Sequence, residues 1–199
     1  MSPTTLPLIG GQPPERSDAA RNRERLLAAA RRLVETCGVS GVTMEAVAAE
    51  AGVGKGTVFR RFENRAGLMA ALLNYSEAAW QADVMSGPPP LGPGAPPLDR
   101  LLAFGRSRLE LNLTHADLIE AASRSFGRAY APYSFAAMHV RYLLGELGVA
   151  GDLPLLATSL LAPLEVVILE QQVHLEGMDI ERIVAGWSDL VRRVVAVRA

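Results

Sequence analysis

Apolar residues recur at the spacing of an α-helix through most of the chain. The clearest stretch begins at Ser17, where Leu26, Ala30 and Leu33 fall on one helical face, and it ends at Gly38. No alternating pattern long enough for a β-strand is present, and no internal repeat is found. We therefore predict an all-α fold. At 199 residues the chain is long enough for one large domain or two small ones.

Turn-forming residues divide this helical pattern into segments. We predict a flexible, proline-containing arm over residues 1–16, and helices over 17–38, 43–51 and 55–62. A fourth helix is expected from Arg65 to about Met85, so the N-terminal domain covers residues 17–75. The stretch 86–97, rich in Pro and Gly, predicts a loop.

The remaining residues, 98–199, are expected to form a larger C-terminal helical domain. Its first helices are predicted over 98–113, over 115–126 with Thr114 as N-cap, and over 133–147. One helix is then expected through Leu160 and Ile168, and the last begins after Gly177 with Asp179 as its cap.

The sequence gives no sign of export or of a membrane span. The N-terminal residues lack a basic region followed by an apolar run, and the longest uncharged stretch, 84–98, is interrupted by Pro and Gly. We therefore expect a cytoplasmic protein that does not enter a membrane. The single cysteine, Cys37, has no partner for a disulfide, and we expect it to be a small buried residue.

Charge is distributed unevenly along the chain. Residues 1–75 contain ten Lys and Arg against seven Asp and Glu, whereas the rest contains ten against fourteen. A basic N-terminal part indicates a polyanionic partner for that part, and an acidic C-terminal part indicates a different role. Nineteen of the twenty basic residues are Arg, and the exception is Lys55.

Two short predicted helices, 43–51 and 55–62, are joined by a turn that contains Gly52 and Gly54. With the longer helix before them they make a helix-turn-helix, in which the second short helix enters the major groove of DNA. Small residues at the start of that helix allow a close approach to phosphates and bases, and Arg60 and Arg61 supply charge. In isolation this arginine pair would indicate only a solvated basic face.

The run from Val42 to Leu68, VTMEAVAAEAGVGKGTVFRRFENRAGL, resembles the N-terminal domain of TetR-family transcriptional regulators. The resemblance covers about residues 17–75. It implies a homodimer that binds double-stranded DNA at a near-palindromic operator, represses transcription, and is released when a small apolar or aromatic molecule enters the C-terminal domain. The alternative is a constitutive DNA-binding or partner-recruiting dimer without a ligand pocket.

The resemblance also implies DNA-contacting positions. Thr43 and Arg65 match positions that contact phosphates, and the recognition helix contributes Lys55, Gly56, Thr57, Phe59, Arg60 and Arg61. Phe59 departs from the family pattern, in which a Tyr usually places its hydroxyl on a phosphate; it is left to pack or to touch a thymine methyl group. Arg21 and Arg23 are further candidates for phosphate contacts, or form a solvated face.

The C-terminal domain has candidates for two roles. Aromatic and soft residues that either line a ligand cavity or fill an ordinary core are Phe104, Phe126, Tyr130, Tyr133, Phe135, Met138, His139 and Tyr142. Apolar residues of the last two helices that suit the family's four-helix dimer interface are Leu161, Leu164, Ile168, Ile183, Trp187, Leu190, Val191 and Val194. Pro132 and Pro163 are placed to kink helices around such a cavity.

Patterns for other functions are weak. The segment around Lys55 lacks the spacing of a phosphate-binding loop, and no histidine lies in a nucleophile motif, so we predict neither an enzyme nor a cofactor. Glu170 and His174 have the spacing of half a metal site, but without a third ligand a solvated pair is expected, and no metal is assigned.

Overall fold

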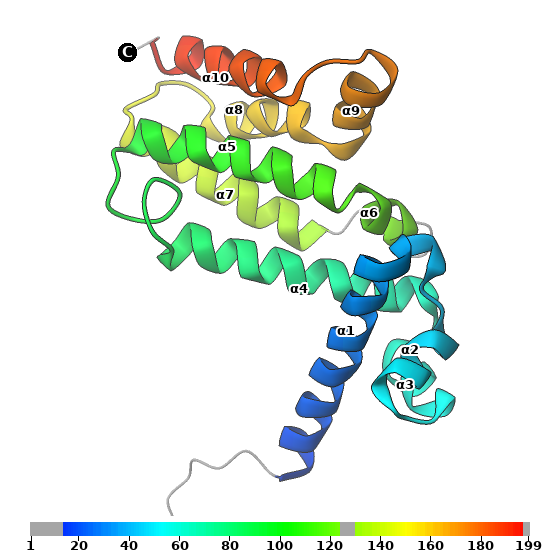
Figure 1. Cartoon of the computed structure of the whole chain (residues 1–199). Helices are drawn as coiled ribbons and strands as arrows, with labels where there is room; N and C mark the ends of the chain where they lie inside the picture. Colours follow the sequence, from blue (N-terminus) through cyan, green and yellow to red (C-terminus); the bar gives the residue numbers. More distant parts are fainter. Residues whose placement is uncertain (1–13, 124–129, 197–199) are drawn as a thin grey trace, which may run out of the picture. The chain divides into compact units, whose positions relative to one another are not determined.

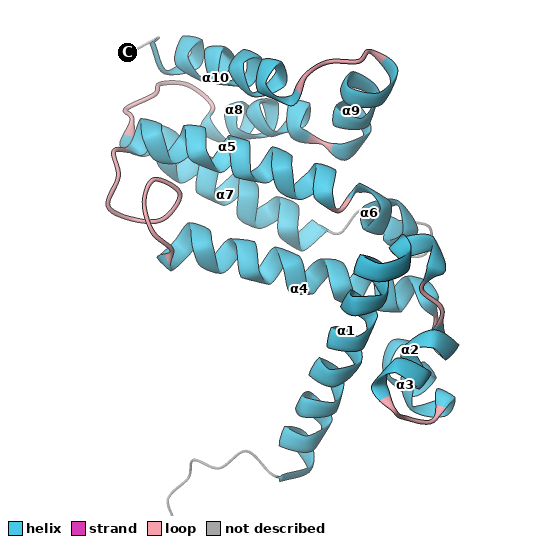
Figure 2. Ribbon diagram, viewed as in Figure 1, coloured by secondary structure: helices cyan, strands magenta, loops and turns pink. Residues whose placement is uncertain are grey.

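The structure, a computed structural model, describes residues 14–123 and 130–196; the side chains of 14–18 and 130–133 are not included. The chain forms two compact units, residues 1–68 and 69–199. None of the described residues forms a β-strand, and helices with the loops between them make up the described parts of both units (Figure 2). This confirms the predicted all-α fold.

The first unit contains three helices and the beginning of a fourth, labelled in Figure 1. Their bounds are α1 (Pro14–Gly41), α2 (Met44–Ala51), α3 (Lys55–Phe62) and α4 (Arg65–Ser86), which continues into the second unit. The predicted limits of α2 and α3 agree with these. Helix α1 begins at Pro14, a residue suited to the first turn of a helix, so the last residues of the expected arm are helical.

The end of α1 differs from the prediction for Cys37. Gly38 interrupts the helical geometry with a φ of 70° and a ψ of 171°, as its predicted role as a stop requires. Cys37 precedes this break and is exposed, with its thiol donating to the Leu33 carbonyl at 3.0 Å. The expectation of a buried cysteine is therefore wrong. Burial along α1 falls from Ala30 to Leu33, so Cys37 lies past the end of the core.

The second unit contains the rest of α4 and all later elements. These are α5 (Pro97–Thr114), α6 (Ala116–Ser123), α7 (Tyr130–Glu146), α8 (Leu153–Leu161), the 3-10 turn η1 (Ala162–Leu164), α9 (Val166–Glu170), the π-helical turn η2 (Gln171–Leu175) and α10 (Ile180–Ala196). Thr114 ends α5 and does not cap α6, and α7 begins three residues before its predicted start. Asp179 caps α10 as predicted, accepting from the Glu181 amide at 3.2 Å.

The segment from Leu153 to Leu175 is not the continuous helix that its apolar pattern predicts. Pro163 lies in η1, and Glu165 has an extended backbone, so the helix ends at Leu161 and begins again at Val166. By length and composition alone this segment, with a mean hydropathy of 1.7, is apolar enough to cross a membrane. Its broken backbone and its buried residues, among them Leu160 and Leu169, agree better with a place in the core.

The core of the second unit lies between α5, α7, α8 and α10, which pack side by side (Figure 1). The ring of Trp187 in α10 lies so close to Gly105 in α5 that a Cβ at Gly105 would overlap it. The Trp187 indole donates to the Leu160 carbonyl at 2.8 Å, which links α10 to α8. Glycine at position 105 thus allows close contact between α5 and α10.

This packing corrects most of the predicted dimer interface. Five of its eight residues are buried inside their own chain, because α8 and α10 direct their strongest apolar stripes at α5 and α7: Leu161, Leu164, Ile183, Trp187 and Val191. Three remain accessible, since Ile168 and Leu190 are exposed and Val194 is half-buried. Of the predicted set, only these three side chains are therefore available for contact with a second copy of the chain.

Candidate nucleic-acid interface

Capping residues fix the two short helices of the first unit. The Thr43 hydroxyl accepts a hydrogen bond from the Ala46 amide at 3.0 Å, so Thr43 caps α2 as its sequence position predicts. Gly52 ends α2 with a left-handed φ of 66°, a conformation that favours glycine. Val58 and Phe62 anchor α3 through its buried face. The opposite face of α3 is thereby turned outward.

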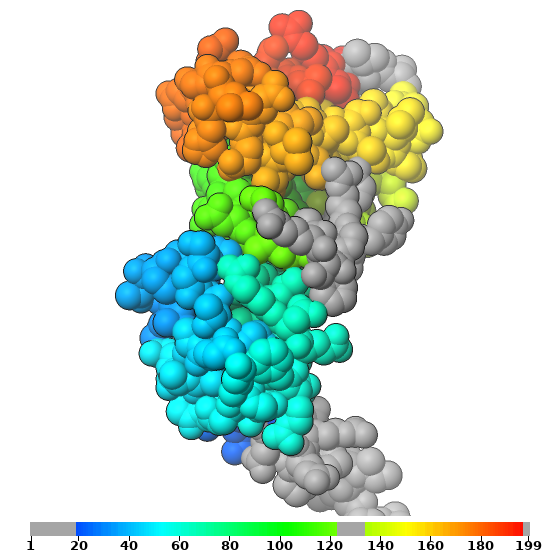
Figure 3. All heavy atoms as spheres, turned by 90° about the vertical axis from the view of Figure 1, so that its right-hand side faces the viewer, coloured from blue at the N-terminus to red at the C-terminus, as the bar shows by residue number. Residues whose placement is uncertain are grey.

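The outward face of α3 carries most of the predicted DNA-contacting residues. Gly56, Phe59, Arg60 and Arg61 are exposed and Thr57 is half-buried; the segment lies at the surface in the space-filling view (Figure 3). A Cβ at Gly56 would meet no atom within 4 Å, so packing within the chain does not require glycine there. A bare backbone at the start of this helix instead suits close approach by a partner.

Lys55 is held by its neighbours in the helix-turn-helix. Its ammonium forms an ion pair with Glu45 in the first turn of α2 and lies 5.4 Å from the ring centre of Phe59. The hydrogen bond from Lys55 is the main cause that holds the pKa of the Glu45 carboxyl below its usual value. Lys55 is exposed, but a phosphate would compete with Glu45 for it. Phe59, 37% exposed, packs beneath this charge.

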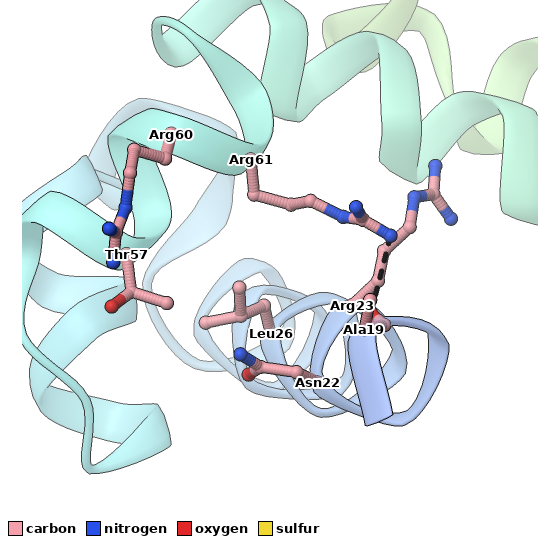
Figure 4. Close-up of a pocket in the computed structure, with 7 residues that line it drawn as sticks. All are labelled: Ala19, Asn22, Arg23, Leu26, Thr57, Arg60 and Arg61. Carbon is pink, nitrogen blue, oxygen red and sulfur yellow. Dashed lines mark hydrogen bonds between the residues drawn. The ribbon is translucent and has the colours of Figure 1, made fainter. Parts of the chain in front are cut away.

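A cleft of about 200 Å³ lies between α1 and α3 (Figure 4). Its lining residues are Ala19, Asn22, Arg23, Leu26, Thr57, Arg60 and Arg61. Arg61 reaches across the cleft and donates to the Ala19 carbonyl at 3.2 Å, whereas Arg60 lies beside Thr57 (Figure 4). Arg60 has no hydrogen bond or ion pair with any residue that the structure describes. Of the two arginines, Arg60 is the one whose donors are free.

Two polar residues of α1 extend this surface. Arg23, a further candidate from the sequence, lines the cleft, and so does Asn22, which sequence reasoning missed. The Asn22 side-chain oxygen is buried and has no hydrogen-bond partner among the described residues. No pattern in the sequence distinguishes Asn22 from other polar residues of α1, because its importance follows from the position of α3.

Arg65 has a different environment from the one expected of a phosphate contact. Its Nε donates to the Val42 carbonyl at 2.8 Å, and Nη2 donates to the Val39 carbonyl. The side chain is half-buried. Two of its donor groups are therefore already used to fasten the start of α4 to the end of α1, which indicates a structural role.

Comparison with known proteins agrees with this geometry. Residues 26–72 match the family model described as bacterial regulatory proteins, tetR family. The matched segment contains α2, α3 and the beginning of α4, together with the part of α1 that packs on them. Residues 26–72 thus form a TetR-family DNA-binding domain. No curated protein matches it in sequence.

Several solved structures resemble most of the chain. The multidrug binding protein EbrR, complexed with imidazole, is 27% identical, with 98% of this chain and all of that one aligned at a TM-score of 0.59. SCO7222, a TetR from Streptomyces coelicolor, is 20% identical, with 89% and 99% covered and a TM-score of 0.65. SmeT in complex with triclosan is 22% identical, with 85% and 89% covered and a TM-score of 0.53.

This domain makes the chain a helix-turn-helix DNA-binding protein of transcription regulation. In helix-turn-helix proteins the second helix of the motif lies in the major groove, and α3 is the second helix of this one. The sequence prediction of the family and of the helix-turn-helix is confirmed.

The residues predicted to line a ligand cavity differ in how deeply they are buried. Phe104 is fully buried and His139 is 5% exposed, and their rings stack with centres 5.1 Å apart. Met138 and Tyr142 are 50% and 52% exposed, so they do not line an interior cavity as expected, because α7 turns them toward solvent. Phe126 lies outside the described residues, and only the backbone is described for Tyr130 and Tyr133.

Phe135, also in that set, and Trp80, which is outside it, complete the cluster around His139. Trp80 in α4 lies 5.0 Å from Phe104 and 5.9 Å from Phe135, measured between ring centres, and Phe135 also stacks on His139. In the sequence, nothing distinguishes Trp80 from the other apolar residues of α4. Its role arises because α4 and α7 place Trp80 and Phe135 side by side.

The possible metal half-site is an exposed pair. His174 Nε2 lies 3.6 Å from a Glu170 carboxylate oxygen, and both side chains are more than 40% exposed. Within residues 14–123 and 130–196, no group of three His, Cys, Asp or Glu side chains is arranged to bind a metal ion.

Proposed function

We propose that the chain is a cytoplasmic homodimeric repressor. In this proposal the α3 helices of two copies bind a near-palindromic operator, and a small apolar or aromatic molecule in the second unit releases the dimer from DNA. The observation that carries the DNA-binding part is the outward face of α3, where Arg60 has free donors beside Thr57 and Gly56.

The roles of the α3 residues follow from their contacts. Arg60 is the main candidate for a base or phosphate contact, and Gly56 and Thr57 allow the helix to lie close to the groove. Arg61 supports α3 against α1 through its bond to Ala19, and Lys55 is shared between Glu45 and DNA. Thr43 caps α2 at a helix N-terminus, which favours a phosphate nearby.

A dimer is supported by apolar side chains that the second unit leaves exposed. Leu155 in α8 is 61% exposed, Ile168 in α9 40% and Leu190 in α10 39%. We propose that these residues, with Val194, contribute to the interface in place of the buried five. A two-fold pair would present its recognition helices to major grooves about 34–36 Å apart, one turn of DNA.

Release by a ligand is supported by likeness and by the aromatic cluster. EbrR has been solved with imidazole and SmeT with triclosan, both ring compounds. The cluster of Trp80, Phe104, Phe135 and His139 provides ring faces and a polar atom in the second unit of this chain. In the alternative, a constitutive dimer without a ligand, these rings would only fill the hydrophobic core.

Selection of bound DNA from a random pool tests the proposal and supplies the operator. Arg60→Ala is then expected to weaken operator binding about 10- to 100-fold, the range for loss of one good base contact. Arg141→Ala, which removes the same charge from an exposed position of α7, is the matched control and should change binding less than twofold. Unchanged operator affinity of Arg60→Ala at moderate salt would contradict the assignment.

A screen for compounds that dissociate the protein–operator complex tests the ligand part. Release by ring compounds at concentrations that leave the protein folded would support a ligand-released repressor. If a broad set of apolar and aromatic compounds leaves the complex intact, the constitutive alternative is favoured.

A further inference from the structure

His139 occupies the centre of the aromatic cluster in the second unit. Its ring centre lies 5.1 Å from that of Phe104, 6.0 Å from that of Phe135 and 6.3 Å from that of Tyr142. Only 5% of the residue is exposed. A polar ring therefore lies where the surrounding residues would otherwise form an apolar core.

The imidazole of His139 has an unpaired nitrogen in this core. Two of the other polar groups there are paired: Asn112 donates to the Leu164 carbonyl at 2.7 Å, and Arg108 donates to Glu77 at 2.6 Å. His139 Nε2 is buried and has no hydrogen-bond partner among the described residues. Because an unpaired buried polar atom destabilises a folded protein, its presence needs a compensating role.

Arg100, one helix over in α5, is unsatisfied as well. Its Nε is buried without a partner, and the side chain forms no hydrogen bond or ion pair with the part of the chain that the structure describes. Burial, aided by the positive charge of Arg100, lowers the pKa of His139 to about 4. At neutral pH the imidazole is therefore uncharged, with one nitrogen that accepts and one that donates.

We propose that His139 Nε2 is the anchor for an aromatic ligand that carries a hydroxyl group, a phenol or its phenolate. The ligand ring would be placed among the rings that surround His139, and Arg100 would favour the ionised oxygen. An imidazole nitrogen can accept from a phenol or donate to a phenolate, so both forms satisfy it. This inference rests on the proposed release by a ligand, and it specifies the ligand's chemistry.

The other classes of ligand fit these groups less well. A hydrocarbon would leave Nε2 unpaired, and an organic cation would be repelled by Arg100. Tyr142 is half-exposed and Phe135 is partly buried, whereas Phe104 is fully buried. A ligand would therefore reach His139 from the side of Tyr142 and Phe135. Binding would displace one of these two outer rings from its contact with His139.

Titration of the full chain with 4-nitrophenol and with nitrobenzene tests the anchor, because the two probes differ by the hydroxyl group. We expect the wild type to bind 4-nitrophenol at least about tenfold more tightly, as a site built to pair a hydroxyl group should. His139→Phe keeps a ring in the stack but removes Nε2. It should reduce this preference to about twofold and leave the affinity for nitrobenzene nearly unchanged.

Arg100→Gln gives a second measurement that does not depend on the folding of the first variant. The absorbance of 4-nitrophenol reports its ionisation, and the wild type should bind it with the ionisation shifted to lower pH. Arg100→Gln should reduce that shift, whereas Arg141→Gln, at an exposed position of α7, should not. Equal affinity for both probes, or a preference that survives in His139→Phe, would overturn the anchor.

The same samples separate this inference from the proposed function. If the wild type binds 4-nitrophenol through His139 but stays on its operator, the anchor holds and release by this ligand class fails. If some compound releases the wild type and His139→Phe equally well, release holds and the anchor fails. A crystal structure with the probe present but only an ordered water on Nε2 would also overturn the anchor.

Discussion

The two units use polar side chains in opposite ways. In the first unit Lys55, Arg60 and Arg61 lie at the surface of α3, and a partner could replace the contacts of Lys55 with Glu45 and of Arg61 with Ala19. In the second unit Glu77 and Asn112 are buried and bonded within the chain. Substitutions on α3 should therefore alter DNA binding with little effect on folding, whereas substitutions in the second core should alter stability first.

The largest effect expected in the second unit is that of Gly105→Ala. A Cβ there would overlap the Trp187 ring, so either Trp187 loses its bond to Leu160 or α5 moves away from α10. We expect a loss of about 3 kcal/mol in the free energy of unfolding, as for severe overpacking of a core. Urea denaturation followed by circular dichroism measures it.

Gly145→Ala is the matched control for this substitution. Gly145 is also helical, but its Cβ would meet only a Leu153 methyl group at 3.9 Å, an ordinary contact. Alanine is expected to stabilise α7 by about 0.5–1 kcal/mol. If both variants lost stability equally, the close packing of α5 on α10 would not be the cause.

Acid should destabilise the second unit through His139. The pKa of His139 is lowered from its ordinary value of 6.5 to about 4 in the folded chain, so the unfolded chain binds more protons between these values. Stability from this group is therefore present above about pH 6.5 and is lost as pH falls toward 4. The loss is on the order of 2 to 3 kcal/mol.

His139→Phe removes this titration, so the difference in unfolding free energy between variant and wild type should grow as pH falls from 7 to 4. Carboxylates elsewhere titrate in both proteins and cancel in the difference. An equal response of wild type and variant to pH would show that His139 is solvated and not held neutral in the core. Arg100 faces His139 from α5 and contributes to the shift, so Arg100→Gln should reduce the pH dependence slightly.

Sequence reasoning succeeded where the signal is local. Thr43, Gly52 and Gly54 each specify a cap or a turn through their own chemistry, so α2 and α3 could be predicted almost to the residue. The apolar stripe of α10 was also visible, but a stripe does not say which surface covers it. Trp187 and Val191 suit a second copy of the chain as well as α5, and only the fold assigns them to the core.

The same limit applies to the candidate sites. Arg60 and Arg61 are adjacent and chemically identical in the sequence, yet the α1–α3 geometry bonds Arg61 to Ala19 and leaves Arg60 free. His139 and Met138 are neighbours too, and α7 buries one and exposes the other. Such distinctions depend on which face of a helix meets the core, and residue identity does not determine that.

Arg65 sharpens the contrast between the units, because it is a first-unit arginine that resembles the bonded polar groups of the second. Its bonds to the Val42 and Val39 carbonyls predict that Arg65→Ala lowers the free energy of unfolding by about 1–2 kcal/mol, since two half-buried carbonyls lose a charged donor. Arg65→Lys should recover only part of this, because one ammonium replaces a planar fork of donors.

Binding measurements on the same variant decide between the two roles of Arg65. If the residue is structural, Arg65→Ala should leave the salt dependence of operator binding unchanged at temperatures where the variant is folded. If it contacts a phosphate, the slope of log affinity against log salt should fall by about one and stability should stay the same. The second result would return Arg65 to the DNA-contacting set that the sequence predicts, and would mean that its bonds to the two carbonyls break when DNA binds.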